Sequence, residues 1–244
     1  TDGSWSVPNP GLSDGDTITA VSTDPAGNTS TPATAVVDGL APNTPVIDPV
    51  NGTDPITGTA EPGSTVTVTY PDGSTASVVA GTDGSWSVPN PGLSDGDTIT
   101  AVSTDPAGNT STPATAVVDG LAPTVALNDV LTNDSTPALT GTIDDPTATV
   151  VVSVDGVNYT AVNNGDGTWT LADDTLSALI DGPHTVTVAA TDLAGNVGTD
   201  TSVVTVDSTA PSATTVIAIE SISDDTGLSA TDFITNDTSL TING

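Results

Sequence analysis

The chain has 244 residues and a formal charge of −31, with no Lys, Arg, Cys or Met and a single His. This composition excludes a disulfide framework, and it excludes Ser-His or Cys-His nucleophile systems repeated along the chain. Thirty-one acids without a cation also repel phosphate, so we expect no contact with nucleic acid. No apolar run approaches the roughly 20 residues that a membrane-spanning helix needs, so we expect no membrane insertion in this segment.

An internal repeat sets the domain organisation. Residues Thr1 to Pro42 recur unchanged as Thr82 to Pro123, a period of 81 residues. The motif Val-Asp-x-x-Ala-Pro marks the repeat ends, at 37–42, 118–123 and 206–211. We therefore expect an excerpt of a longer array, divided into the C-terminal half of a repeat (1–41), a complete repeat (42–122), a complete diverged repeat (123–209) and the N-terminal part of a further repeat (210–244).

Apolar residues alternate with Thr and Ser along each repeat, for example Val66, Val68 and Tyr70 against Thr65, Thr67 and Thr69. Period two is typical of strands, and Gly and Pro interrupt the chain every 8 to 12 residues, as in an all-β sandwich. In the complete repeat we predict seven strands: Val46–Val50, Pro55–Glu61, Ser64–Tyr70, Ser74–Ala80, Ser85–Pro89, Thr98–Asp105 and Thr110–Asp119.

The aromatic residues and the histidine are expected to serve structure. Each Trp (Trp5, Trp86, Trp169) precedes an apolar residue by two positions, at Val7, Val88 and Leu171, which predicts that both lie in a sandwich core. The one histidine, His184, aligns with an aspartate in the other repeat, so we expect a solvated strand end and no catalytic or metal role.

The acids are almost all Asp, because Glu61 and Glu220 are the only glutamates among 31 acidic residues. Many are explained as turn residues that bond their own backbone, as in Asp72-Gly73 and Asp83-Gly84. A halophilic surface is a second explanation, although it usually mixes in Glu and Lys. A third explanation concerns the acids at the repeat ends.

Alternating strand directions bring the last strand of one domain toward two loops of the next. At the first junction this predicts convergence of Asp38, Glu61, Asp105 and Asn109. At the second junction the corresponding residues are Asp119, Asp144, Asp145, Asp192 and Asn196, and Asp207 begins a third. Oxygen-only ligands suit Ca²⁺, which takes 6 to 8 oxygens, better than Zn²⁺ or the stricter octahedral Mg²⁺. The sequence therefore predicts a Ca²⁺ site at each junction.

The Thr-Asp-x-Ala-Gly-Asn turns at 23–28, 104–109 and 191–196, together with the Val-Asp-x-x-Ala-Pro motifs, resemble bacterial immunoglobulin-like repeats of giant biofilm-associated adhesins. Residues 223–227 and 235–237 are similar to the opening of another repeat variant of that family. The resemblance implies seven-stranded immunoglobulin-like sandwiches arranged as an extended rod. It also implies type I secretion, attachment at the outer membrane of a bacterial cell and a stalk role in adhesion and biofilm formation.

The expected partners are the neighbouring repeats of the chain and, beyond them, the same adhesin on other cells or a host surface. Two alternatives stay open. The repeats could themselves bind a partner, by homotypic or glycan contacts through their Thr- and Ser-rich strand faces, although the six aromatic residues are few for a sugar platform. They could also be spacers of a larger surface enzyme whose catalytic domain lies elsewhere.

Overall fold

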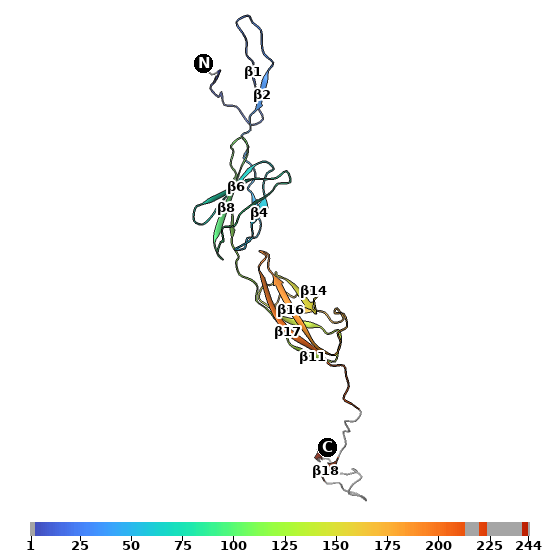
Figure 1. Cartoon of the computed structure of the whole chain (residues 1–244). Coiled ribbons are helices and arrows are strands. Elements are labelled where there is room, and N and C mark those ends of the chain that lie inside the picture. The colour runs from blue at the N-terminus through green and yellow to red at the C-terminus, as the bar shows by residue number, and fades with distance from the viewer. Residues whose placement is uncertain (1–2, 213–219, 224–240, 244) are drawn as a thin grey trace.

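The computed structural model describes residues 3–212, 220–223 and 241–243, and it consists of strands and loops (Figure 1). A search of these residues finds no helix that is long and apolar enough to cross a membrane. Two separate hydrophobic clusters, one between Val50 and Val118 and one between Val125 and Val206, define two sandwich domains. They correspond to residues 42–122 and 123–209, which we call the first and second domain.

The first domain contains one strand in each of the seven predicted intervals. A three-stranded sheet has the order β3-β4-β7, and a four-stranded sheet has the order β6-β5-β8-β9. Alternate residues of β5, at Val66 and Val68, are fully buried between the sheets, as period two requires. The bounds are β3 (Val46–Ile47), β4 (Ile56–Thr59), β5 (Thr65–Thr69), β6 (Thr75–Val79), β7 (Ser85–Val88), β8 (Thr98–Thr104) and β9 (Ala114–Val117).

The second domain has eight strands in one continuous sheet of order β10-β12-β15-β14-β13-β16-β17-β11, and its first segment is divided between the two edges of that sheet. The segment β10 pairs antiparallel with β12, whereas β11 pairs parallel with β17. In the first domain the same division leaves only a parallel bridge between Val50 and Val118, so the predicted single strand 46–50 is wrong there. The bounds are β10 (Val125–Leu127), β11 (Val130–Thr132), β12 (Leu139–Ile143), β13 (Thr149–Val154), β14 (Val157–Asn163), β15 (Thr168–Leu171), β16 (Gly182–Thr191) and β17 (Val197–Val206).

A tryptophan lies over a glycine in both cores. Trp86 and Trp169 are buried, as the sequence predicts, and they pair across the sheet with Gly58 and Gly141. A Cβ at Gly141 would stand 1.8 Å from the Ala126 carbonyl oxygen and 2.6 Å from Nε1 of Trp169. The indole ring therefore occupies the space that any other residue would need.

Residues 3–41 do not form a sandwich. They contain the hairpin of β1 (Thr17–Ala20) and β2 (Ala33–Val36), which stands apart from the first domain at the N-terminal end (Figure 1). The prediction that Trp5 and Val7 lie in a core is therefore wrong for this unit: Trp5 is 71% exposed and Val7 is 73% exposed. The strands that cover the equivalent residues in the first domain are absent here.

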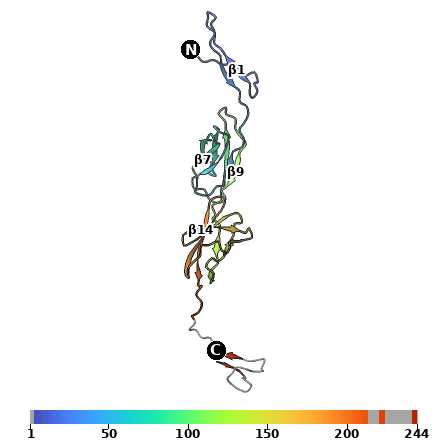
Figure 2. The ribbon, with the colours of Figure 1, turned by 90° about the vertical axis from the view of Figure 1, so that its right-hand side faces the viewer.

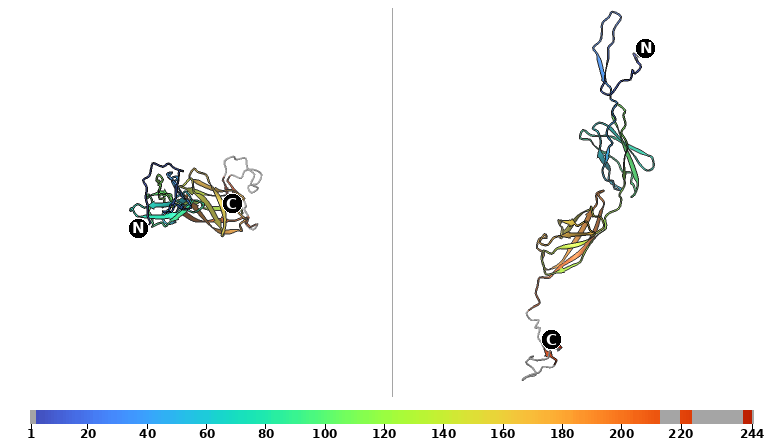
Figure 3. Two further views of the ribbon diagram at one scale, coloured as in Figure 1. Left: turned by 90° about the horizontal axis from the view of Figure 1, so that it is seen from above. Right: turned by 180° about the vertical axis from the view of Figure 1, so that it is seen from behind.

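Near the C-terminus, β18 (Ser221–Ile222) pairs with β19 (Ile242–Asn243). The motif at 223–227 lies outside the described residues apart from its first position, and the motif at 235–237 lies wholly outside them. The hairpin and the two domains follow one another along one direction in three views (Figures 1 to 3). Each domain therefore meets the next through its end, at a joint between its last strand and the following loops.

Candidate metal site at the domain joints

Each Thr-Asp-x-Ala-Gly-Asn turn is closed by its own aspartate. The two carboxylate oxygens of Asp105 accept hydrogen bonds from the backbone N–H and the side-chain amide of Asn109, both at 2.9 Å. Gly108 has a positive φ of 94°, which glycine adopts without strain. Burial acts to raise the pKa of Asp105, but the N–H donors of Asn109, Gly108 and Ala107 together hold that pKa below its usual value. The Asp105 carboxylate is therefore part of the hydrogen-bonded structure of the turn.

The asparagine of this turn also reaches the preceding domain. The Asn196 amide donates to the backbone carbonyl of Asp119 at 2.8 Å, and the Asn109 amide donates to that of Asp38 at 3.0 Å. The same contact thus occurs at both joints. These residues meet as the sequence predicts, and they meet through a hydrogen bond from the amide to a main-chain carbonyl.

Aspartates also accept hydrogen bonds from the linker that follows the last strand of each domain. Asp95 accepts from the Gly120 N–H at 3.0 Å, and Asp119 accepts from the Leu121 N–H at 3.2 Å. After the second domain, Asp181 accepts from Ser208 and Thr209, whose hydroxyls and backbone lower its pKa to about 2. The linkers are therefore ordered turns, which explains part of the acidity without any ion.

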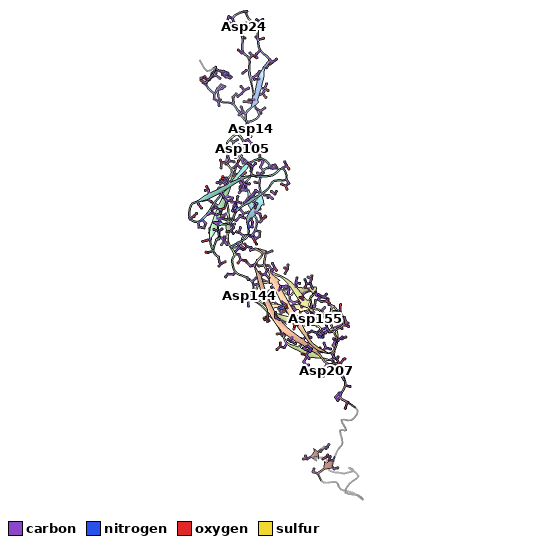
Figure 4. The ribbon with its side chains drawn as sticks, viewed as in Figure 1. Asp14, Asp24, Asp105, Asp144, Asp155 and Asp207 are labelled. Atoms are coloured by element: carbon purple, nitrogen blue, oxygen red, sulfur yellow. The ribbon has the colours of Figure 1, made fainter. Side chains whose placement is uncertain are left out.

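At the second joint, four of the predicted acids line one hollow of about 400 Å³ between the two domains. Asp119 comes from the end of the first domain, and the others come from two loops of the second domain (Figure 4 labels Asp144). Asp192 is half-buried and Asp144 is exposed. The four acids that line the hollow are Asp119, Asp144, Asp145 and Asp192. Asn196, the fifth residue predicted for this joint, donates a hydrogen bond to the backbone carbonyl of Asp119.

The Thr124 N–H donates to Asp144 at 2.7 Å, and hydrogen bonds from Thr124 hold the pKa of Asp144 below its usual value. Asp145 accepts from the backbone N–H and hydroxyl of Thr147. Each carboxylate keeps unused lone pairs, since an ionised carboxylate offers about four acceptor positions. In the part of the chain that the structure describes, no three Asp, Glu or His side chains are grouped to hold a metal ion. Calcium at this joint stays a prediction.

The first joint is arranged differently. Glu61 lies beside a smaller hollow of about 340 Å³ with Asn43 and Thr44, and neither Asp38 nor Asp105 lines it. The Asn109 amide joins Asp38 and Asp105 by hydrogen bonds there, whereas Glu61 lines a hollow that includes neither acid. At the far end of the second domain, Asp207 caps the Thr209 N–H, and its metal role is untested (Figure 4).

One joint contact was not predicted. The Asn51 amide donates to the Ala194 carbonyl at 3.0 Å and, within the first domain, to the Asp54 carboxylate at 2.6 Å. Together with the bond from Asn196 to Asp119, the turn 191–196 is therefore bonded to the first domain twice. Asn51 is buried. It lies in the Asn-Gly-Thr-Asp turn that follows Val50, a pattern that indicates a turn but gives no sign of its partner.

The prediction of a solvated His184 is wrong. The imidazole is buried in the second domain, with Nδ1 at 2.6 Å from the Asp155 carboxylate and Nε2 at 2.7 Å from the Ile180 carbonyl. Both partners are acceptors, so only the imidazolium satisfies both contacts. The Ile180 carbonyl and then Asp155 raise the pKa of His184. The ring fastens the 172–181 loop to the β13-β14 turn, which is a structural role.

The second domain is expected to lose stability as the pH rises. The folded pKa of His184 lies above its ordinary value near 6.5, so its contribution is complete below about pH 6.5 and is lost as the pH rises through the folded pKa. The loss should be about 1 kcal/mol, the typical net value of one hydrogen bond. Denaturant unfolding at pH 5.5 and 8.5 measures it. In H184Q the difference should vanish; a variant that keeps the full difference would contradict this assignment.

Two protein-family models match separate parts of the chain. Residues 123–208 match the family model described as "Bacterial Ig-like domain", and residues 41–120 match the one described as "Bacterial Ig domain". No curated protein matches the chain.

Similar solved structures include a tetra-tandem repeat from the extending region of a large adhesion protein. It is 28% identical, with 79% of this chain and 56% of that chain covered and a TM-score of 0.35. A Ca²⁺-stabilised adhesin that helps an Antarctic bacterium bind ice is 27% identical, with 78% and 56% covered and a TM-score of 0.30. A biofilm-associated protein domain is 20% identical, with 69% and 30% covered and a TM-score of 0.30. The chain spans little more than half of the first of these structures.

Proposed function

This chain belongs to the bacterial Ig-like domains, and we propose that it is a stretch of the extracellular stalk of a bacterial surface adhesin whose domain joints are stiffened by Ca²⁺. The observation that carries the proposal is the hollow at the second joint, which acidic residues of both domains line. The stalk holds an adhesive end away from the cell in adhesion and biofilm formation.

Charge is the physical reason that such a joint favours a cation. The chain contains no Lys or Arg that could pair with Asp119, Asp144, Asp145 and Asp192. Carboxylates held close together without a counter-charge repel one another. Ca²⁺ would supply two positive charges and a shell of 6 to 8 oxygens at 2.3–2.6 Å. Among the common divalent ions it tolerates this loose, oxygen-only set best.

The chain's own residues would do most of the positioning. The Asn196 amide and the Asp119 carbonyl already hold the two domains in register, and Thr124 orients Asp144 toward the linker. The exposed carboxylates at the hollow's rim need only a rotamer change, which takes nanoseconds or less, to converge. Bridging Asp119 to the opposing loops would then restrict bending at the joint.

Calcium binding to the whole chain tests the proposal, with the two joint acids removed together as D144N/D145N. Asparagine at 144 keeps an oxygen for the Thr124 N–H, so the fold should persist. The original chain should bind Ca²⁺ in the range of about 10⁻⁴ to 10⁻³ M, as extracellular modules do. The variant should bind at the second joint at least about tenfold more weakly, since two charged ligands are lost. Isothermal titration calorimetry measures both.

The matched control is D173N/D174N, an equally acidic pair in a loop of the same domain that does not line the hollow. It should bind Ca²⁺ like the original chain. Equal affinity in D144N/D145N and the original chain would exclude the second joint as the site. An equal loss in both variants would indicate only diffuse attraction of cations to an acidic surface.

A further inference from the structure

The first segment of each domain reaches the last strand of the same domain and runs parallel to it. In the second domain this contact is a ladder of three residue pairs between β11 and β17. In the first domain it is the single bridge between Val50 and Val118. The Val50 carbonyl accepts from the Asp119 N–H at 2.9 Å, as the Thr132 carbonyl accepts from the Asp207 N–H at 2.8 Å, so the two contacts are equivalent. We call them the terminal clamps of the two domains.

The length of the segment that leads to each terminal clamp explains the difference. Ile47 and Leu127 are equivalent, because each pairs with the glycine that lies under a core tryptophan. From there the first domain reaches its clamp through residues 48–49, whereas the second domain has residues 128–131. The two additional residues allow two additional pairs in the clamp of the second domain.

Side chains add to the stronger attachment of this segment in the second domain. Asp200, on β17, accepts a hydrogen bond from β10, and Asp129 accepts one from β17. Nε1 of Trp169 donates to a β10 carbonyl at 2.9 Å. The buried Nε1 of Trp86 has no hydrogen-bond partner among the described residues. The first segment of the first domain therefore lacks both the indole bond and two of the ladder pairs.

The direction of the strands decides how a terminal clamp carries a pull on the two ends of the chain. The domains follow one another end to end (Figure 1), so a pull draws the first segment of a domain and its last strand in opposite directions. Because the two are parallel neighbours, they are drawn past one another, and the evenly spaced hydrogen bonds of the clamp bear the load together. A clamp of three pairs therefore resists more force than a single bridge.

We propose that the two domains differ in mechanical strength and that the first domain is the extensible element of the chain. A pull on the ends opens it while the second domain stays folded. Each residue of an opened domain adds up to about 3.3–3.6 Å of chain. Opening of the first domain would thus limit the force that reaches the rest of a stalk. This use rests on the proposed function, whereas the difference in strength does not.

Single-molecule force spectroscopy of the intact chain tests the difference. The chain has no Cys, so a cysteine added at each end gives unique points of attachment. Chelator is present throughout, which separates the result from calcium stiffening. We expect two domain-sized unfolding events at different forces, since forced unfolding is governed by the rate at which each domain opens. Two events at the same force would overturn the proposal.

The variant T132P should lower the force of the stronger event and leave the weaker event unchanged. Thr132 bonds β17, and a proline has no N–H to give to the ladder. L131P is the matched control, because Leu131 is 79% exposed and is equivalent to Pro49, a proline that the first domain already contains. It should leave both forces unchanged. An equal fall in T132P and L131P would overturn the assignment to the terminal clamp.

A reciprocal variant lengthens the weaker clamp and does not depend on the folding of T132P. Residues 48–49 are replaced by the four-residue sequence of residues 128–131. Strand β9 is the edge of its sheet, so the longer segment finds free backbone groups beside Val118. The weaker event should then move toward the force of the stronger one. A weaker event that stays at its original force would contradict the proposal.

Discussion

Replacing Gly141 with alanine is expected to destabilise the second domain strongly. The new methyl group would stand 1.8 Å from the Ala126 carbonyl oxygen and 2.6 Å from Nε1 of Trp169, and both of these groups are held by a 2.9 Å hydrogen bond between them. Neither a backbone carbonyl nor a fully buried indole can move away without breaking β10-β12 pairing. Overpacking of a rigid core usually costs about 1–3 kcal/mol and sometimes more, and we expect at least about 3 kcal/mol here.

A loss of about 3 kcal/mol corresponds to a fall in Tm of roughly 12–24 °C for a domain of this size. Hydrogen exchange resolved by peptide measures it on the intact chain: protection should fall across 123–209 and persist across 42–122. Gly39, in a linker with open space around its Cα, gives the control, since G39A meets only the Asp14 Cβ at 3.9 Å. Unchanged protection in G141A would show that the Trp169 ring packs elsewhere. The equivalent G58A should affect the first domain alone.

Replacing Asn196 with alanine is expected to loosen the second joint. The change removes the 2.8 Å bond to the Asp119 carbonyl and the 2.9 Å bond to the Asp192 carboxylate. The bond from Asn51 to Ala194 remains, so the domains should stay adjacent but sample wider angles. Losing this side chain should cost the second domain about 1–3 kcal/mol, because two hydrogen bonds disappear and one of them is to the half-buried Asp192 carboxylate. Residual dipolar couplings, measured for each domain of N196A, should then give different alignment tensors for the two domains.

The control for this joint is Asn28, which occupies the same position in the unit of residues 3–41. Its amide donates to the Asp24 carboxylate, and within the described residues it makes no bond to a carbonyl of another unit, so N28A repeats the damage to the turn without touching either joint. The alignment of the two domains in N28A should match that of the original chain. A joint that stays equally rigid in N196A would show that Asn51 and the linker turns hold it alone.

The fold was predictable because its signals are local. Alternation of Val and Thr in β5 and the Trp-x-Val or Trp-x-Leu pattern in β7 and β15 each require one buried face, and these strands lie where the pattern indicates. The change of sheet after β3 was not predictable, since a short run such as Val46–Val50 carries no signal for which sheet it joins. The prediction that Trp5 is buried was wrong for a related reason. Burial depends on the strands that pack against a residue, and the residues next to it in the sequence do not reveal them.

At the joints, the sequence predicted which residues meet but not how they bond. Repetition of Asp and Asn at fixed repeat positions identified Asp119, Asp192 and Asn196 as neighbours. It gave no means of separating an aspartate that closes a turn, such as Asp95, from one that faces an open hollow, such as Asp145. His184 shows the same limit, because its acceptors Asp155 and Ile180 come from two separate loops.

Small-angle X-ray scattering of the intact chain in Ca²⁺ and then in chelator tests the stiffened stalk most directly. A metal that bridges Asp119 to the loops of the second domain should lengthen the particle and narrow its distribution of distances, and the chelator should reverse both changes. D144N/D145N should scatter alike in the two conditions, in the form of the chelated chain. Identical profiles of the original chain with and without Ca²⁺ would contradict calcium stiffening, and the joint would then be held by the Asn196 and Asn51 amides and the linker turns.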